Sequence, residues 1–131
     1  MLVASSNTKE LSKYKIRKTI NIISEFCKEN IGKVKSKGYP RVQISYTSSD
    51  CMGLYDPFDH KVIIFVNACE TLSDLTSTVI HEWTHSKQRV LTDYVRLYKK
   101  FGYDNHPMEI EAYDSEKKWN RKALNFLKKN W

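Results

Sequence analysis

The sequence predicts an α+β fold in a single domain that spans residues 1–131. Three observations support this prediction. Apolar residues recur at helical spacing towards both ends of the chain, short stretches rich in β-branched residues occupy its middle, and 131 residues with 40% hydrophobic content suffice for one modest core. We therefore expect an N-terminal helix, then a small three-stranded and mainly antiparallel sheet, then two further helices.

The N-terminal helix is expected over residues 8–31. Its apolar positions recur three or four residues apart, as on one face of a helix, and are Ile16, Ile20, Ile23 and Cys27. Lysines occupy the other faces, and Gly32 ends the pattern. The helix is expected to act as a scaffold that lies against the sheet.

Three strands are expected over residues 41–46, 51–55 and 61–66. The first alternates in polarity, and the third is the richest in β-branched and aromatic residues. The sequence Asp56-Pro57-Phe58-Asp59 is typical of a turn between the second and third strands. Because the three strands follow one another closely in the chain, we expect an antiparallel meander.

The segment after the sheet predicts a helix that begins near Ser73 or Asp74, either of which suits an N-cap, and continues to about Tyr94. The residues expected on its core face share one side of the helix, and are Leu72, Val79, Trp83, Val90 and Tyr94. Residues 97–105 contain a glycine and an Asp-Asn pair, so we expect a loop there.

This helix carries an H-E-x-x-H pattern, His81-Glu82-Trp83-Thr84-His85. Residues four apart lie one helical turn apart, so both imidazoles can reach one ion at about 2.0–2.1 Å, and two neutral imidazoles suit Zn²⁺. Glu82, rotated by about 100° from His81, is placed to accept a proton from water rather than to join the ligands. The histidines lie opposite the core face, so a third ligand is expected from elsewhere in the chain.

The last helix is expected from Pro107 to about residue 129, with Asn105 or His106 as its cap. Its apolar face is formed by Met108, Ala112, Tyr113, Trp119, Ala123, Leu124, Phe126 and Leu127. Glu109 lies within this face and needs a partner, because burying an isolated charge is costly. A metal ion held by the two histidines is the partner that the chain offers.

Two other glutamates of the last helix have different expected surroundings. Glu111, about 200° from Glu109, lies among lysines and is expected to face solvent. Glu116 shares the face of Glu109. We expect Glu116 to pair with a lysine at the rim, and a position beside the metal ligands is the alternative.

Together, His81-Glu-Trp-Thr-His85 and the later His106-Pro-Met-Glu109-Ile-Glu-Ala112 resemble the gluzincin metallopeptidases, and the small single-domain minigluzincins in particular. The order of elements also resembles theirs, as does Gly53-Leu-Tyr55-Asp-Pro57. The resemblance implies a minimal zincin-like fold with an active-site helix and a C-terminal glutamate helix. It also implies Zn²⁺ held by His81, His85 and Glu109.

The activity implied by this resemblance is that of a zinc metalloendopeptidase, a hydrolase that acts on a peptide or protein substrate with Glu82 as general base. The chain departs from the family pattern at Tyr113, where an acidic residue often orients a zinc-bound histidine. No oxyanion-stabilising motif is recognisable. Tyr103, His106 and Tyr113 are the candidates for that role.

Two other function classes stay open at this point. One is a non-catalytic zincin-fold protein with a structural or assembly role, against which the intact Glu82 argues. The other is a DNA-associated protease with His106 as third ligand. The net charge of +7 predicts weak non-specific nucleic-acid binding, but no dense basic run is interleaved with aromatics.

The cysteines and the lack of a recognisable targeting segment indicate the expected cellular location. Cys27, Cys51 and Cys69 have neither disulfide-framework nor metal-site spacing, so all three are expected to be reduced, buried thiols. No signal peptide or transmembrane stretch is recognisable, so we expect a cytoplasmic location and no membrane partner. Association with a particle and export by a non-standard route are the alternatives. The oligomeric state is left open.

Overall fold

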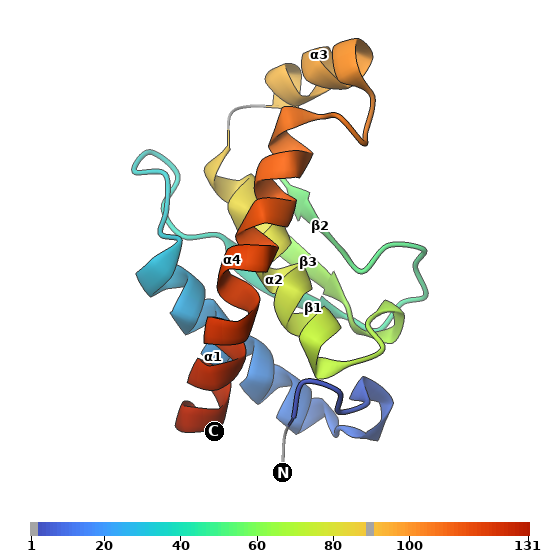
Figure 1. Ribbon diagram of the computed structural model, residues 1–131, viewed down its shortest axis with the longest axis vertical. Helices are drawn as coiled ribbons and strands as arrows, with labels where there is room; N and C mark the ends of the chain where they lie inside the picture. Colours follow the sequence, from blue (N-terminus) through green and yellow to red (C-terminus); the bar gives the residue numbers. More distant parts are fainter. Residues whose placement is uncertain (1–2, 89–90) are drawn as a thin grey trace.

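The computed structural model describes residues 3–88 and 91–131, and its α+β architecture confirms the predicted fold class. The elements in chain order are η1 (Thr8–Glu10), α1 (Lys13–Asn30), β1 (Arg41–Ser45), β2 (Gly53–Asp56), β3 (Lys61–Phe65), η2 (Val66–Ala68), α2 (Leu72–Lys87), α3 (Leu91–Phe101) and α4 (Pro107–Asn130). Figure 1 shows α2 near the centre, with α4 crossing it on the near side and the sheet behind. Within the described ranges, none of the helices has the length and apolar character that crossing a membrane requires.

The sheet is mixed, and its strand order is β1-β3-β2. β1 runs parallel to β3, whereas β2 pairs with β3 in antiparallel fashion. The expected meander is therefore wrong, because β3 lies between the two strands that precede it. β3 is the most apolar of the three strands, and it is the one that is paired along both edges. Its residues Val62 and Ile64 are completely buried.

The N-terminal helix begins later than predicted. Thr8 is buried and its backbone N–H donates to the Glu70 carbonyl at 3.0 Å, while its hydroxyl donates to the Cys69 carbonyl. These bonds anchor the first turn, η1, to the segment before α2. The chain then leaves helical geometry at Leu11, and α1 begins after Ser12, which caps the Lys15 N–H at 3.2 Å.

The helix that carries the two histidines is shorter than predicted. Its N-cap is Thr71, in a capping box with Asp74, and it ends at Lys87 because Gln88 has an extended backbone. The expected continuation to Tyr94 is wrong, and α3 occupies part of the segment expected to be a loop. Val90, predicted on the core face, lies outside the described residues.

The core lies where α2 meets α1, α4 and β3. The fully buried side chains come from each of these elements and include Ile20, Ile23, Ile64, Val79, Trp83 and Leu127. The indole N–H of Trp83 donates to the Gly32 carbonyl at 2.9 Å, which links the core to the turn after α1. The described cysteines are free thiols, but only Cys27 and Cys69 are buried. Cys51 is exposed in the loop before β2, contrary to the prediction.

β2 packs unusually closely on α2 at Gly53. A Cβ at this position would lie 2.7 Å from Thr78 Cγ2, 2.9 Å from the Ile63 carbonyl oxygen and 3.2 Å from Glu82 Cγ. The carbonyl belongs to the neighbouring strand and cannot rotate away as a side chain can. Glycine at this position therefore sets the distance between the strand and Glu82.

We predict that Gly53→Ala destabilises the protein by about 1–3 kcal/mol, the usual effect of overpacking a close contact. Urea unfolding measures this change. Leu54→Ala is the matched control, because Leu54 is the adjacent residue and is 37% exposed, so its loss should cost less. Equal stability of Gly53→Ala and the parent would show that β2 can move away from α2 without cost.

Candidate metal centre

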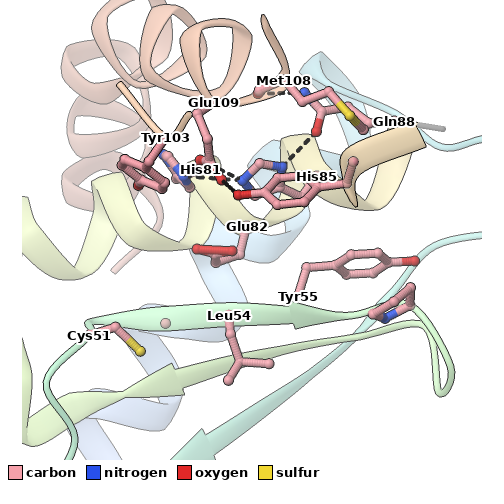
Figure 2. Close-up of a pocket in the computed structure, with 13 residues that line it drawn as sticks. Cys51, Leu54, Tyr55, His81, Glu82, His85, Gln88, Tyr103, Met108 and Glu109 are labelled. Atoms are coloured by element: carbon pink, nitrogen blue, oxygen red, sulfur yellow. Dashed lines mark hydrogen bonds and ion pairs between the residues drawn. The ribbon is translucent and has the colours of Figure 1, made fainter. Parts of the chain in front are cut away.

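The helix α2 presents His81 and His85 on one side, one turn apart, as the sequence predicts. Their Nε2 atoms lie 3.2 Å from each other, and both side chains are 11% exposed. Figure 2 shows the two rings directed at Glu109, above Glu82. α2 thus places two imidazole nitrogens at the wall of one pocket.

α4 supplies the carboxylate. Glu109 lies in the first turn of this helix, whose N-cap is His106, and its side chain is 7% exposed. Ala112, one turn further on, is fully buried and allows α4 to lie close to α2. The prediction that Glu109 occupies the buried face is confirmed.

The three side chains converge on one point. Glu109 Oε1 lies 3.0 Å from the Nε2 atoms of both His81 and His85. One ligand atom from each residue lies within 4.8 Å of the others, so the three can hold one metal ion. Two imidazoles and one carboxylate are a donor set of a kind that binds metal ions in proteins.

Each histidine is oriented through its other ring nitrogen. His81 Nδ1 donates to Glu116 Oε2 at 2.6 Å, and His85 Nδ1 donates to Gln88 Oε1 at 2.6 Å. A proton on Nδ1 leaves the Nε2 lone pair available for a metal, which is the usual arrangement of metal-binding histidines. The expected pairing of Glu116 with a rim lysine is therefore wrong, and the alternative position beside the ligands is correct.

The second oxygen of Glu109 also has a partner. The Tyr94 hydroxyl donates to Glu109 Oε2 at 2.5 Å, so Oε1 alone faces the histidines. This contact was not predicted, because helical periodicity put Tyr94 on the core face of one long helix. A helix end at Gln88 would have been the signal, but no glycine or proline marks it.

His106, the alternative third ligand, does not belong to this cluster, and nor does Glu111. His106 is fully buried, and its ring accepts from the Met108 N–H and donates to the Tyr94 carbonyl at 2.9 Å. Both nitrogens of His106 are therefore occupied, and its ring stacks on Tyr94. Glu111 accepts from Gln88 Nε2 at 2.8 Å instead of lying only among lysines. The proposal of His106 as third ligand is not supported by this geometry.

Glu82 faces the same pocket, whose volume is about 340 Å³, and is 8% exposed. Burial raises the pKa of its carboxyl, while the positive charges on His85 and His81 oppose this rise. Among the described residues, no hydrogen-bond donor contacts the Glu82 carboxylate. Figure 2 shows Glu82 between the histidines and strand β2. Its carboxylate is therefore available to a molecule in the pocket.

The candidates for an oxyanion-stabilising group differ in position. Tyr103 lines the pocket, and its hydroxyl lies 3.0 Å from that of Tyr113. The Tyr113 ring packs edge-on against His81 with centroids 4.7 Å apart, and the His106 ring stacks on Tyr94. Of these three, only Tyr103 borders the pocket.

In the metal-free protein, the histidines and glutamates of the site shift one another's pKa values. Burial lowers the pKa of His81, but hydrogen bonds to Glu109 and Glu116 outweigh it and raise that pKa to about 9. Burial also lowers the pKa of His85, and the hydrogen bond to Glu109 again raises it. Burial raises the pKa of Glu109, but its bonds to both histidines and Tyr94 hold it well below its usual range. A metal ion would thus replace protons at this site.

Comparison of the chain with models of known protein families, with curated proteins and with solved structures gave no match.

We predict that His81→Ala, His85→Ala and Glu109→Ala each weaken metal binding by more than about 100-fold. Loss of a residue that only supports a ligand weakens metal binding by about 10- to 100-fold, so a larger effect marks a ligand. Zn²⁺ affinity is measured by competition with a chromophoric chelator. Asp114→Ala is the matched control, because it removes an exposed carboxylate from the same helix without touching the groups that hold the histidines. The ligand set is wrong if Glu109→Ala binds Zn²⁺ like the parent.

A second prediction concerns pH. In the metal-free protein, the pKa of His81 is about 9, above its ordinary value of 6.5. A raised folded-state pKa contributes stability that is fully present below the unfolded pKa and is lost as pH rises through the folded pKa. The free energy of unfolding should therefore fall between about pH 6.5 and about pH 9.

Urea unfolding with excess chelator at both pH values tests this expectation. The difference in stability between the parent and His81→Ala should shrink as pH rises. A difference that stays constant would show that protonated His81 does not stabilise the metal-free fold.

Proposed function

We propose that this protein is a zinc-dependent metallopeptidase of the gluzincin type, with His81, His85 and Glu109 as zinc ligands and Glu82 as general base. The observation that carries the proposal is the convergence of two imidazoles and one carboxylate beside a pocket that a second, uncommitted carboxylate also lines. A purely structural metal site has no need of that second carboxylate.

The residues present fit zinc. Two Nε2 atoms with their Nδ1 protons fixed, and one oxygen of a carboxylate whose other oxygen is bonded to Tyr94, match the ligand types that zinc prefers. When bound, Zn²⁺ supplies Lewis-acid polarisation of a carbonyl group and lowers the pKa of water towards ~7.

Glu82 supplies the proton transfer. Its buried carboxylate accepts a proton from the attacking water and delivers it to the nitrogen of the departing amine. Burial raises the pKa of Glu82, which makes it a stronger base than an exposed glutamate. This environment and the position of Glu82 between the histidines and β2 support the proposed role as general base.

Tyr103 is the group that we propose for stabilising negative charge on the substrate carbonyl oxygen, because it lines the pocket. Burial, followed by the hydrogen bond to Tyr113, raises the pKa of its hydroxyl, which therefore stays protonated. Either hydroxyl of the Tyr103–Tyr113 pair can be the donor, so the Tyr103 proton can rotate away from Tyr113 towards the pocket, where an oxyanion requires such a donor.

The edge strand beside the pocket supports a peptide as substrate. The Phe65 N–H donates to the Met52 carbonyl at 2.8 Å, and antiparallel alternation then leaves the backbone groups of Gly53 and Tyr55 pointing away from β3. Both residues line the pocket. An extended peptide can therefore bind this edge by main-chain hydrogen bonds and present a bond to Glu82.

We predict that Glu82→Gln lowers the rate of peptide hydrolysis by at least about 100-fold while zinc content and melting temperature stay close to the parent's. Hydrolysis is measured on a library of quenched fluorescent peptides, with metal content determined on the same samples. Glu29→Gln is the matched control, since Glu29 is an exposed glutamate far from this site in the chain.

The outcomes separate the function classes. Equal activity of Glu82→Gln and the parent would exclude the proposed mechanism. A parent protein that binds zinc tightly but cleaves no peptide would favour the non-catalytic structural role.

A further inference from the structure

A second surface carries chemistry that the metal centre does not use. Two hollows of about 820 and 350 Å³ lie between α1 and β1, and both are lined by Asn21 and Val42, so they form one continuous groove. We refer to it as the α1–β1 groove. It is separate from the metal pocket, with which it shares no lining residue.

The rim of this groove is basic. Five cationic side chains and one carboxylate line it: Lys13, Arg17, Lys28, Arg41, Lys61 and Glu25. Lys28 pairs with Glu25 at 3.0 Å, and Lys61 pairs with Asp59 at 3.5 Å. Within residues 3–88 and 91–131, no carboxylate pairs with the other three. The groove thus has a surplus of positive charge.

The groove also borders an unpaired strand edge. β1 is an outer strand of the described sheet and pairs only with β3. The Arg41 N–H donates to the His60 carbonyl at 3.2 Å, and the alternation of a parallel ladder then turns the backbone groups of Val42 and Ile44 away from β3. Two residues therefore offer an N–H and a carbonyl to a further strand.

The side chains between the basic rims are apolar. Ile22 from α1 and Val42 and Ile44 from β1 line the groove and are half-buried. An extended chain added to β1 would direct alternate side chains to the α1 side, where Val42, Ile44 and Arg17 lie, and the others to the opposite side, where the register partners Arg41 and Lys61 lie. Apolar residues suit the groove floor on the first side, and acidic residues suit the cations that border the floor and occupy the second side.

From these features we infer that the α1–β1 groove is a docking site for an extended acidic peptide segment, which adds as a strand to the free edge of β1. The partner requires carboxylates for the basic rim, a main chain with alternating donors and acceptors for β1, and small apolar side chains for the groove floor.

A peptide fits this surface better than single-stranded nucleic acid. A phosphodiester backbone offers acceptors but no N–H donors, so it would leave the outward carbonyls of Val42 and Ile44 without partners. Nucleic-acid grooves also stack bases on exposed aromatic rings, whereas the ring of Tyr46 in this groove is covered by the Lys13 ammonium at 4.8 Å.

The docking site is independent of the proposed hydrolysis. β1 and β2 lie on opposite edges of the sheet, two strand spacings or about 10 Å apart. A protein bound at β1 through an acidic segment would be retained close to the metal pocket without occupying it.

Fluorescence anisotropy with a labelled peptide of alternating Glu and Val tests the inference, with mass spectrometry to verify that the peptide stays intact. The double variant Arg17→Glu/Arg41→Glu should bind at least about tenfold more weakly than the parent. Lys117→Glu/Arg121→Glu is the matched control, because it makes the same change in net charge at exposed positions of α4 and should bind like the parent.

Two backbone measurements test strand addition itself. The amides of Val42 and Ile44 should gain protection from hydrogen exchange in the complex, while that of Gln43, which points at β3, should not change. Val42→Pro removes an outward N–H without breaking a bond to β3, so it should bind about tenfold more weakly than Val42→Ala.

Three results would overturn the inference: equal binding of a peptide with Lys in place of Glu, protection of Gly53 and Tyr55 instead of Val42 and Ile44, or tighter binding of oligo-dT that Arg17→Glu/Arg41→Glu abolishes. The exchange measurement uses the parent protein, so it decides the matter even if Val42→Pro fails to fold.

Discussion

The structure depends on a buried carboxylate. Glu109 lies on the apolar face of α4 with 7% of its side chain exposed, where an isolated charge would cost several kcal/mol. Its two oxygens are satisfied by His81, His85 and Tyr94, which belong to two other helices. These bonds are made only if α2 and α4 keep one relative rotation and height. The packing of the helices and the geometry of the site are therefore one constraint.

The groups around this carboxylate are supported in turn. Glu116 and Gln88 each hold the remote nitrogen of one histidine, and Gln88 also donates to the Met108 carbonyl and to Glu111 at the start of α4. A change in any of these partners alters the orientation of a ring before it alters the core. We expect metal affinity to be more sensitive than stability to such changes, because the hydrophobic contacts of Trp83 and Leu127 lie on the other side of α2 and further along α4.

The central position of β3 gives the small sheet two different free edges. The edge formed by β2 borders the metal pocket and approaches α2 closely at Gly53, whereas the edge formed by β1 borders a groove with a basic rim. A meander would have placed β2 in the centre and closed the edge beside the pocket. The mixed order therefore leaves main-chain groups of both outer strands unpaired within the described sheet.

Arrangements that lie within one helix were predictable from residue spacing. A period of 3.6 residues places His81 and His85 together, sets Trp83 on the opposite face and puts Glu109 among the apolar residues of the last helix, and the structure has each of these arrangements. The strand order, the end of α2 at Lys87, and the contacts of Glu116 and Tyr94 with the site were not predictable in this way. These depend on residues that are distant in the chain, so local periodicity holds no information about which partner each one meets.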